Sequence, residues 1–236
     1  MDSDPIIRDL EIMADARNYQ AWIIDHIKSG LGRKIVEVGA GIGTFTSRLL
    51  DRDVVIALDT YEPCVEYLKK RYHSYPQILP IQADISSPEV LSLKKYEPDT
   101  IICLNVLEHV QDDEVALAHM YQLLPEGGHL ALLVPAYQFL YGTIDRLVGH
   151  HRRYTKKDLE GKLGRASFSI KKIQYMNSLA TTGWFMTNRV FKQKEESPAQ
   201  VKLYDRYVVP WLRVVERIVP VPFGLSLVVV ATKKTK

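Results

Sequence analysis

Residues 35–46 read IVEVGAGIGTFT, the most informative stretch of the chain. A short apolar strand runs into three glycines at alternate positions, Gly39, Gly41 and Gly43, and a helix is expected to follow. Glycine allows positive φ angles and lets a ligand approach the backbone closely. The stretch therefore predicts a strand, a ligand-facing turn and a helix, with a ligand-free tight turn as the alternative.

The spacing of the glycines narrows the choice of ligand. Dinucleotide folds use G-x-G-x-x-G, whereas this turn is G-x-G-x-G and carries Glu37 two residues before its first glycine. A carboxylate there would repel a pyrophosphate and would attract a cationic group such as an α-ammonium. The turn consequently favours a ligand with an amino group over a dinucleotide.

The rest of the chain alternates short β-branched runs with helical periodicity, which is typical of a parallel sheet covered on both faces. One helix is predicted over residues 10–30, another from the glycine turn onward, and others over 62–72, 112–124 and 155–166. Strands are predicted at 34–40, 54–59, 78–84, 98–106, 129–136, 168–177 and 225–234.

Two segments interrupt this alternation. Residues 137–154 form an insertion after the fifth strand, and residues 178–222 form a long aromatic and amphipathic segment before the last strand; a connection of that length usually acts as a lid or binding element. We expect residues 1–33 to form an N-terminal helical cover and residues 34–236 to form one domain that contains both insertions.

Glu-x-Gly-x-Gly-x-Gly after the first strand resembles motif I of the class I methyltransferases that use S-adenosylmethionine. LNVLEHV at the end of the fourth strand and LLPEGGHLAL before the fifth are similar to later motifs of that family. The resemblance covers at least residues 34–136. It implies an α/β Rossmann-like fold with seven strands, mostly parallel with the last antiparallel, helices on both faces and a helical lid between strands six and seven.

The resemblance also implies which residues hold the cofactor, whose product is S-adenosylhomocysteine. Asp59 would accept from the ribose hydroxyls, Asp84 from the adenine amino group, and Asn105 would line the methionine part. Each also has a plain structural interpretation, as a helix cap, a turn residue or a backbone partner. The full expected set is Glu37, Gly39, Ala40, Gly41, Gly43, Asp59, Thr60, Asp84, Ile85, Asn105 and Val106.

Residues 149–154, GHHRRY, follow the fifth strand, so they are expected beside the cofactor at the carboxyl edge of the sheet. Asp-x-x-x-Gly-His-x-Arg-Arg-Tyr resembles a motif of a bacterial and archaeal methyltransferase subgroup sometimes fused to glycosyltransferases. We expect His150 oriented by Asp145, or His109, to act in acid–base chemistry. The predicted acceptor-binding residues are Tyr19, Tyr137, His151, Arg152, Arg153 and Tyr154.

Other interpretations of this motif remain open. In one, the motif is a solvated basic turn with no part in catalysis or acceptor binding. In another, one or both arginines are structural and lock the insertion through ion pairs with Asp145 or Asp158. We prefer His150 to His151, and no metal site is expected.

Composition limits the partners. The net charge of the 236-residue chain is only +3, which argues against nucleic acid and suits a small acceptor. The two cysteines, Cys64 and Cys103, are expected as reduced buried thiols, and with no signal-like start the chain is expected in the cytoplasm. The segment around Trp211 is interpreted as a cover, an acceptor pocket, a homodimer face or a helix that docks on a membrane.

Together with these features, the resemblance implies methyl transfer from S-adenosylmethionine to a hydroxyl or carboxylate oxygen of an anionic or amphipathic metabolite. The alternatives are an N- or C-methyltransferase acting on a lipid or natural-product intermediate, and a scaffold that binds the cofactor without turnover.

Overall fold

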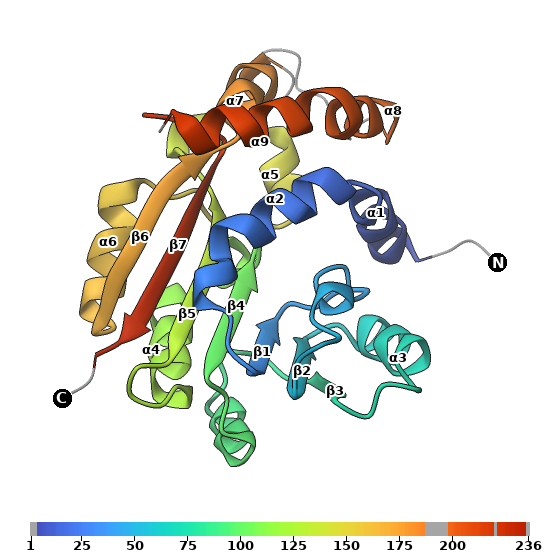
Figure 1. Ribbon diagram of the computed structural model, residues 1–236, viewed down its shortest axis with the longest axis vertical. Helices are drawn as coiled ribbons and strands as arrows, with labels where there is room; N and C mark the ends of the chain where they lie inside the picture. The colour runs from blue at the N-terminus through green and yellow to red at the C-terminus, as the bar shows by residue number, and fades with distance from the viewer. Residues whose placement is uncertain (1–3, 187–197, 220, 235–236) are drawn as a thin grey trace.

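The computed structural model describes residues 4–186, 198–219 and 221–234. Its centre is a seven-stranded sheet in the order β3-β2-β1-β4-β5-β7-β6, in which only β7 runs antiparallel to its neighbours (Figure 1). This topology confirms the predicted mostly parallel sheet. The strands are β1 (Lys34–Val38), β2 (Val54–Asp59), β3 (Ile78–Gln82), β4 (Thr100–Leu104), β5 (His129–Pro135), β6 (Phe168–Met176) and β7 (Ser226–Lys233).

Helices cover both faces of the sheet and also its carboxyl edge, where the parallel strands end (Figure 1). The α-helices are α1 (Pro5–Ala14), α2 (Arg17–Ile27), α3 (Glu62–Arg71), α4 (Asp113–Leu123), α5 (Thr143–Leu147), α6 (Lys156–Arg165), α7 (Ser178–Trp184), α8 (Pro198–Leu203) and α9 (Val209–Ile218). Short 3-10 helices are η1 (Lys28–Gly30), η2 (Thr46–Arg48), η3 (Pro88–Tyr96), η4 (Leu107–His109) and η5 (Gln138–Leu140), and η7 (Tyr204–Val208) is a π-helix.

Alternate residues of each strand feed two separate cores, as expected for strands buried on both faces. In β1, Val36 belongs to the core that also contains side chains of α4 and α6, whereas Ile35 belongs to the core that contains side chains of α2, α3 and α9. Cys64 and Cys103 are buried and unpaired, as the sequence analysis predicted. Among the described helices, none has both the length and the apolar character needed to cross a membrane.

Two helical predictions differ from the structure. The predicted helix over 10–30 is broken at Asp15–Ala16, because the Asp205 carboxylate caps a new helix: it accepts from the backbone N–H groups of Asn18 (3.2 Å) and Tyr19 (2.8 Å). The helix predicted after the glycine turn is reduced to the single 3-10 turn η2.

The amphipathic segment between β6 and β7 leaves several of its large apolar side chains exposed. Tyr207, Trp211 and Ile218 are 65%, 62% and 74% exposed, whereas Val209 and Leu212 face the sheet. Pro210 lies in the first turn of α9, where its missing N–H costs no hydrogen bond, and a π-helical turn precedes it. Residues 187–197 and 220 of the predicted insertion lie outside the described residues.

Candidate active site

The glycine turn has the backbone that its sequence predicts. Gly39, Gly41 and Gly43 have φ angles of +69°, +55° and +84°, a region in which side chains are strained. A Cβ atom at Gly39 would collide with Val106, and one at Gly43 would lie 2.6 Å from Tyr72. The turn is therefore a closely packed cradle that only glycine can form.

Asp59, at the end of β2, is fixed by this turn. Its carboxylate accepts from the backbone N–H of Gly41 (2.7 Å) and from that of Tyr61 (2.9 Å). Each carboxylate oxygen has a further lone pair for a ligand hydroxyl. The half-buried Asp59 and the adjacent exposed Thr60 thus fit the expected ribose site.

Glu37 lies beneath the turn rather than on its open side. It is 3% exposed and accepts from the Thr46 hydroxyl at 2.6 Å. Burial, reinforced by the nearby Asp59, raises the pKa of Glu37 to about 7. The adjoining Ala40 is buried and donates its N–H to the Leu58 carbonyl (2.7 Å). Glu37 therefore braces the turn against η2.

The remaining expected cofactor residues follow β3 and β4, two strands that end at the same edge of the sheet with β2 and β1 between them. Asp84 is exposed, and one of its oxygens accepts from the N–H and the hydroxyl of Ser86, each at 2.7 Å. Ile85 is buried behind it. Asn105 follows β4 with a φ angle of +55°, and its side chain is exposed beside the half-buried Val106. Both strand ends present polar groups at the carboxyl edge of the sheet.

Helix α1 lies over this cradle (Figure 1). The Leu10 side chain is 3.3 Å from the point where a Cβ atom of Gly41 would be, and the Tyr61 hydroxyl donates to Asp4 just before the helix. Tyr19, in α2, is half-buried with its ring edge-on to Trp22. The N-terminal cover therefore contacts the predicted cofactor residues directly.

The GHHRRY motif is organised around a buried carboxylate. Asp145 is fully buried and accepts from His150 Nδ1 (2.9 Å), Arg153 Nε (2.7 Å) and the Gly142 N–H (2.9 Å). Burial alone would raise the pKa of Asp145, but the His150 hydrogen bond and the Arg153 charge bring it down to about 2. An ionised Asp145 fixes the proton of neutral His150 on Nδ1, so Nε2 carries the lone pair.

His150 Nε2 points toward a second buried acid that the sequence analysis did not select. Glu108 is 1% exposed, and its Oε1 lies 3.9 Å from His150 Nε2. The His109 ring, exposed on one side, packs edge-on against His150 with ring centroids 4.6 Å apart. Burial raises the pKa of Glu108 to about 8. Desolvation by surrounding atoms, and then the His150 and His151 charges, lower the pKa of His109 to about 4.

The arginines and the tyrosine of the motif hold the insertion together. Arg153 is 4% exposed, paired with Asp145 and stacked 4.7 Å from the Trp184 ring centre. Tyr154 is fully buried and donates to Asp113 at 2.8 Å, and Arg152 pairs with the same carboxylate at 2.8 Å. The structure thus contains the Arg153–Asp145 ion pair expected if the arginines are structural. Arg152 pairs with Asp113 and not with Asp158.

Two other predicted acceptor residues border this region. His151 is exposed, and its N–H donates to the Glu108 carbonyl at 2.8 Å. Tyr137 has a φ angle of +63° and stacks on Tyr175 with ring centres 5.0 Å apart. Sequence reasoning missed Glu108 because it stands among apolar residues in LNVLEHV, and only its burial distinguishes it from a solvated glutamate.

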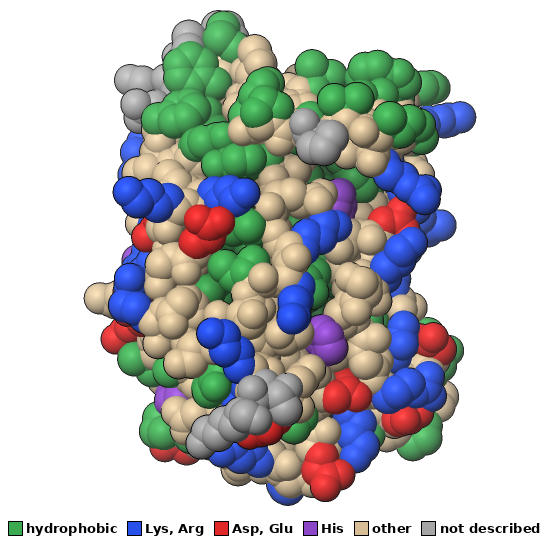
Figure 2. Space-filling view, turned by 60° about the vertical axis from the view of Figure 1, so that its left-hand side comes forward, with side chains coloured by type: hydrophobic (Ala, Val, Ile, Leu, Met, Phe, Trp, Pro, Cys, Tyr) green, Lys and Arg blue, Asp and Glu red, His purple; other side chains and the backbone are tan. Residues whose placement is uncertain are grey.

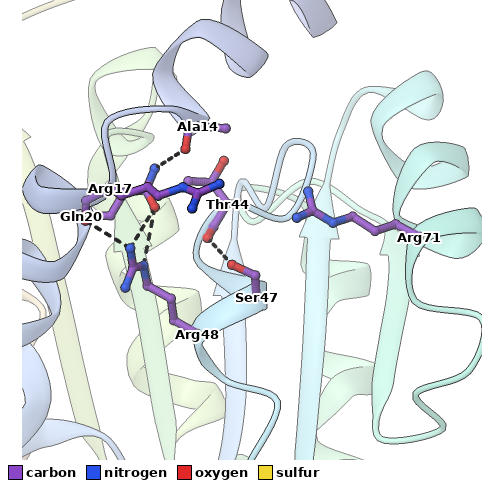
Figure 3. A pocket seen from close by; sticks show the side chains of 7 residues that line it. All are labelled: Ala14, Arg17, Gln20, Thr44, Ser47, Arg48 and Arg71. Carbon is purple, nitrogen blue, oxygen red and sulfur yellow. Dashed lines mark hydrogen bonds between the residues drawn. The ribbon is translucent and has the colours of Figure 1, made fainter. Parts of the chain in front are cut away.

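A separate cavity of about 210 Å³ adjoins the end of the glycine turn (Figure 3). Arg17 and Arg71 point into it from α2 and α3, while Arg48 donates to the Gln20 side chain from below. Within the described residues, none of these three guanidiniums forms an ion pair with a carboxylate. The cavity therefore has the positive charge that an anionic group requires. Its lining is Ala14, Arg17, Gln20, Thr44, Ser47, Arg48 and Arg71.

Comparison with known proteins agrees with this geometry. The protein-family model described as "Methyltransferase domain" matches residues 11–188. An uncharacterized methyltransferase of Schizosaccharomyces pombe is 27% identical over 114 residues, which are 48% of this chain and 43% of that protein. The chain thus spans less than half the length of such curated relatives.

Solved structures share the fold at low identity. A putative methyltransferase from Bacillus halodurans superposes with a TM-score of 0.61 and 15% identity, covering 90% of this chain and 99% of that one. A Thermotoga maritima structure described as a possible histamine N-methyltransferase gives 0.60 and 17%, covering 93% and 92%.

Proposed function

The chain belongs to the S-adenosylmethionine-dependent methyltransferases, and on that premise we propose that it methylates an oxygen of a small-molecule acceptor. The cofactor supplies an activated methyl group and leaves as S-adenosylhomocysteine. The protein must therefore hold both reactants in line and take up the proton of an acceptor hydroxyl.

One observation carries the choice of oxygen: the Asp145–His150 pair at the carboxyl edge of the sheet. The Asp145 carboxylate accepts a hydrogen bond from His150 Nδ1, with 2.9 Å between the nitrogen and the oxygen, which leaves Nε2 as a proton acceptor. A hydroxyl acceptor needs that function, whereas a neutral amine can attack before it loses its proton. In the proposed reaction the hydroxyl proton passes to His150 Nε2 as the oxygen bonds to the methyl carbon.

The cofactor would be held by the groups that converge on the glycine turn. Asp59 would accept from the ribose hydroxyls and Asp84 from the adenine amino group. Asn105 and Val106 would line the methionine part, and Glu37, from beneath the turn, would attract its ammonium. The positive φ angles, the packed cradle and the backbone-anchored Asp59 support this placement.

We further propose that the acceptor is anionic or amphipathic. Because Arg152 and Arg153 are already paired, the support for an anion comes from the cavity of Arg17, Arg48 and Arg71. The support for an apolar part comes from the lid, where hydrophobic side chains gather at one end of the molecule (Figure 2). Exposed members of this surface are Leu179, Phe185, Met186, Leu203, Tyr207, Trp211, Val214, Ile218 and Phe223.

The test uses methyl-labelled S-adenosylmethionine with purified protein and a host extract, followed by partition between solvent and water. We expect labelled product that His150→Asn reduces at least tenfold, with His73→Asn, at an exposed histidine just after α3, as the matched comparison. Base-stable label on nitrogen or carbon would favour the N- or C-methyltransferase alternative. Tight cofactor binding without transfer to any extract would favour the scaffold.

A further inference from the structure

The side chains of Glu108, His109 and His150 form a cluster that the proton-transfer role of His150 does not use fully. Their ligand-type atoms, one carboxylate oxygen and two ring nitrogens, all lie within 4.8 Å of one another. They come from two distant segments, because η4 carries Glu108 and His109 after β4 while His150 follows α5. The fold therefore builds this group from separate parts of the chain.

Glu108 Oε2 is buried without a hydrogen-bond partner, one of four such side-chain atoms in the part of the chain that the structure describes. A buried polar atom of this kind costs free energy unless a partner satisfies it. Its other oxygen, Oε1, is too far from His150 Nε2, at 3.9 Å, for a hydrogen bond. Neither the backbone nor the side chains of the described residues therefore supply a hydrogen bond to Glu108 Oε2, and His150 supplies none to Oε1.

From this geometry we propose that Glu108, His109 and His150 bind a divalent transition-metal ion. Two imidazoles and one carboxylate are a common ligand set for Zn²⁺, Fe²⁺ and related ions. Bonds of about 2.1 Å to such an ion place ligand atoms roughly 3–4 Å apart. The observed spacing needs side-chain shifts of only about an ångström to reach that range.

The surroundings of the cluster have the features of a metal site. Asp145 accepts from His150 Nδ1, so Nε2 is turned toward the cluster, as in the carboxylate–histidine–metal arrangement. Arg153 is neutralised by Asp145, so the Glu108 carboxylate is left to offset part of the ion's charge. The exposed side of His109 provides access from solvent.

Three protein ligands leave coordination positions for an oxygen from outside. An acceptor hydroxyl bound there would lose its proton more readily, because a metal ion lowers the pKa of a bound hydroxyl. This catalytic role rests on the proposed oxygen methylation. With Nε2 bound to the ion, His150 would orient the ion, and the proton of the hydroxyl would pass to solvent water on the exposed side of His109. Metal binding itself does not depend on that function, and it departs from the expectation that no metal site exists.

The test is an equilibrium titration of chelator-treated protein, without cofactor or acceptor. We expect one Zn²⁺ per chain by calorimetry, and Co²⁺ to give the visible absorption of a low-symmetry nitrogen and oxygen site. Glu108→Gln and His150→Asn should each weaken binding at least tenfold, while His151→Asn, at the adjacent exposed histidine, should not. Circular dichroism of each variant checks that it is folded.

Absence of stoichiometric binding to the wild-type protein would overturn the proposal, as would binding that the Glu108 and His150 variants leave unchanged. If the protein binds no metal but transfers the methyl group, the metal site is refuted and the proposed function stands. If the protein binds the metal but transfers no methyl group to any acceptor, the metal site stands and the proposed function is refuted. The two failures are thus distinguishable.

Discussion

The cofactor edge, at the ends of β1 to β4, and the insertion after β5 use the same kinds of residue in opposite ways. At the cofactor edge, Asp59 is held by backbone N–H groups and keeps lone pairs for a ligand. In the insertion, Arg153 and Tyr154 are buried and already paired with Asp145 and Asp113. A polar side chain near an active site is available to a ligand only if the protein has not already satisfied it.

The largest expected effect is a loss of stability when the buried ion pair of the insertion is broken. Arg153→Ala removes the cation that neutralises Asp145 and should lower the free energy of unfolding by about 3–5 kcal/mol. Arg152→Ala is the matched control, since its partly exposed pair with Asp113 predicts a loss of about 1 kcal/mol or less. Urea denaturation measures both. Equal, small losses would show that Arg153 is available to a ligand, like the polar residues of the cofactor edge.

The next effect is a pH dependence at the cofactor edge. Glu37 has a pKa of about 7 when folded against an ordinary 4.5. Between these values only the folded protein keeps the proton, so the free energy of unfolding should fall by about 3 kcal/mol as the pH rises from 4.5 to 7.

Glu37→Gln, which can still accept from Thr46, should remove this dependence and be the more stable protein at pH 8. Denaturation at a series of pH values provides the measurement. If the two proteins change in parallel, Glu37 does not titrate in this range.

Asp59→Ala should affect binding more than folding. Loss of an anchored carboxylate acceptor for two hydroxyls should cost about 3 kcal/mol of binding free energy, roughly a 100-fold rise in the dissociation constant of S-adenosylmethionine. Calorimetric titration measures it, with Asp53→Ala, an exposed acid paired with Arg33, as control. Unchanged affinity for Asp59→Ala would remove this residue from the cofactor site.

The smallest effect distinguishes packing from acceptor contact within the motif. Tyr154→Phe removes one hydroxyl from Asp113, which keeps Arg152 and Lys162 as partners, and should cost about 1 kcal/mol of stability. The KM for the acceptor should stay within twofold. A tenfold rise in KM at constant stability would show that the hydroxyl meets the acceptor.

The sheet and the edge at which the polar residues gather were predictable because strands buried on both faces read as apolar runs, and parallel strands bring their ends together. The breaks in the helices were not, since the cap that divides 10–30 comes from Asp205, far along the chain. Glu108 was missed for a similar reason: its burial, and its approach to His150, arise only when η4 meets the insertion.

The break at Asp15–Ala16 has a kinetic consequence. Helix α2 is anchored at its start by Asp205 and along its length by the Asp25–Arg213 pair. Helix α1, which precedes the break, contacts the glycine turn through Leu10. A cofactor held at the glycine turn would lie next to Leu10, so we expect the ten residues of α1 to move when it enters while α2 stays in place. We then expect the opening of α1 to limit both association and dissociation of the cofactor and to make its exchange slow at any given affinity. Removing α1 should accelerate both rates, because the rate-limiting step is the movement of α1 and not the breaking of contacts with the cofactor.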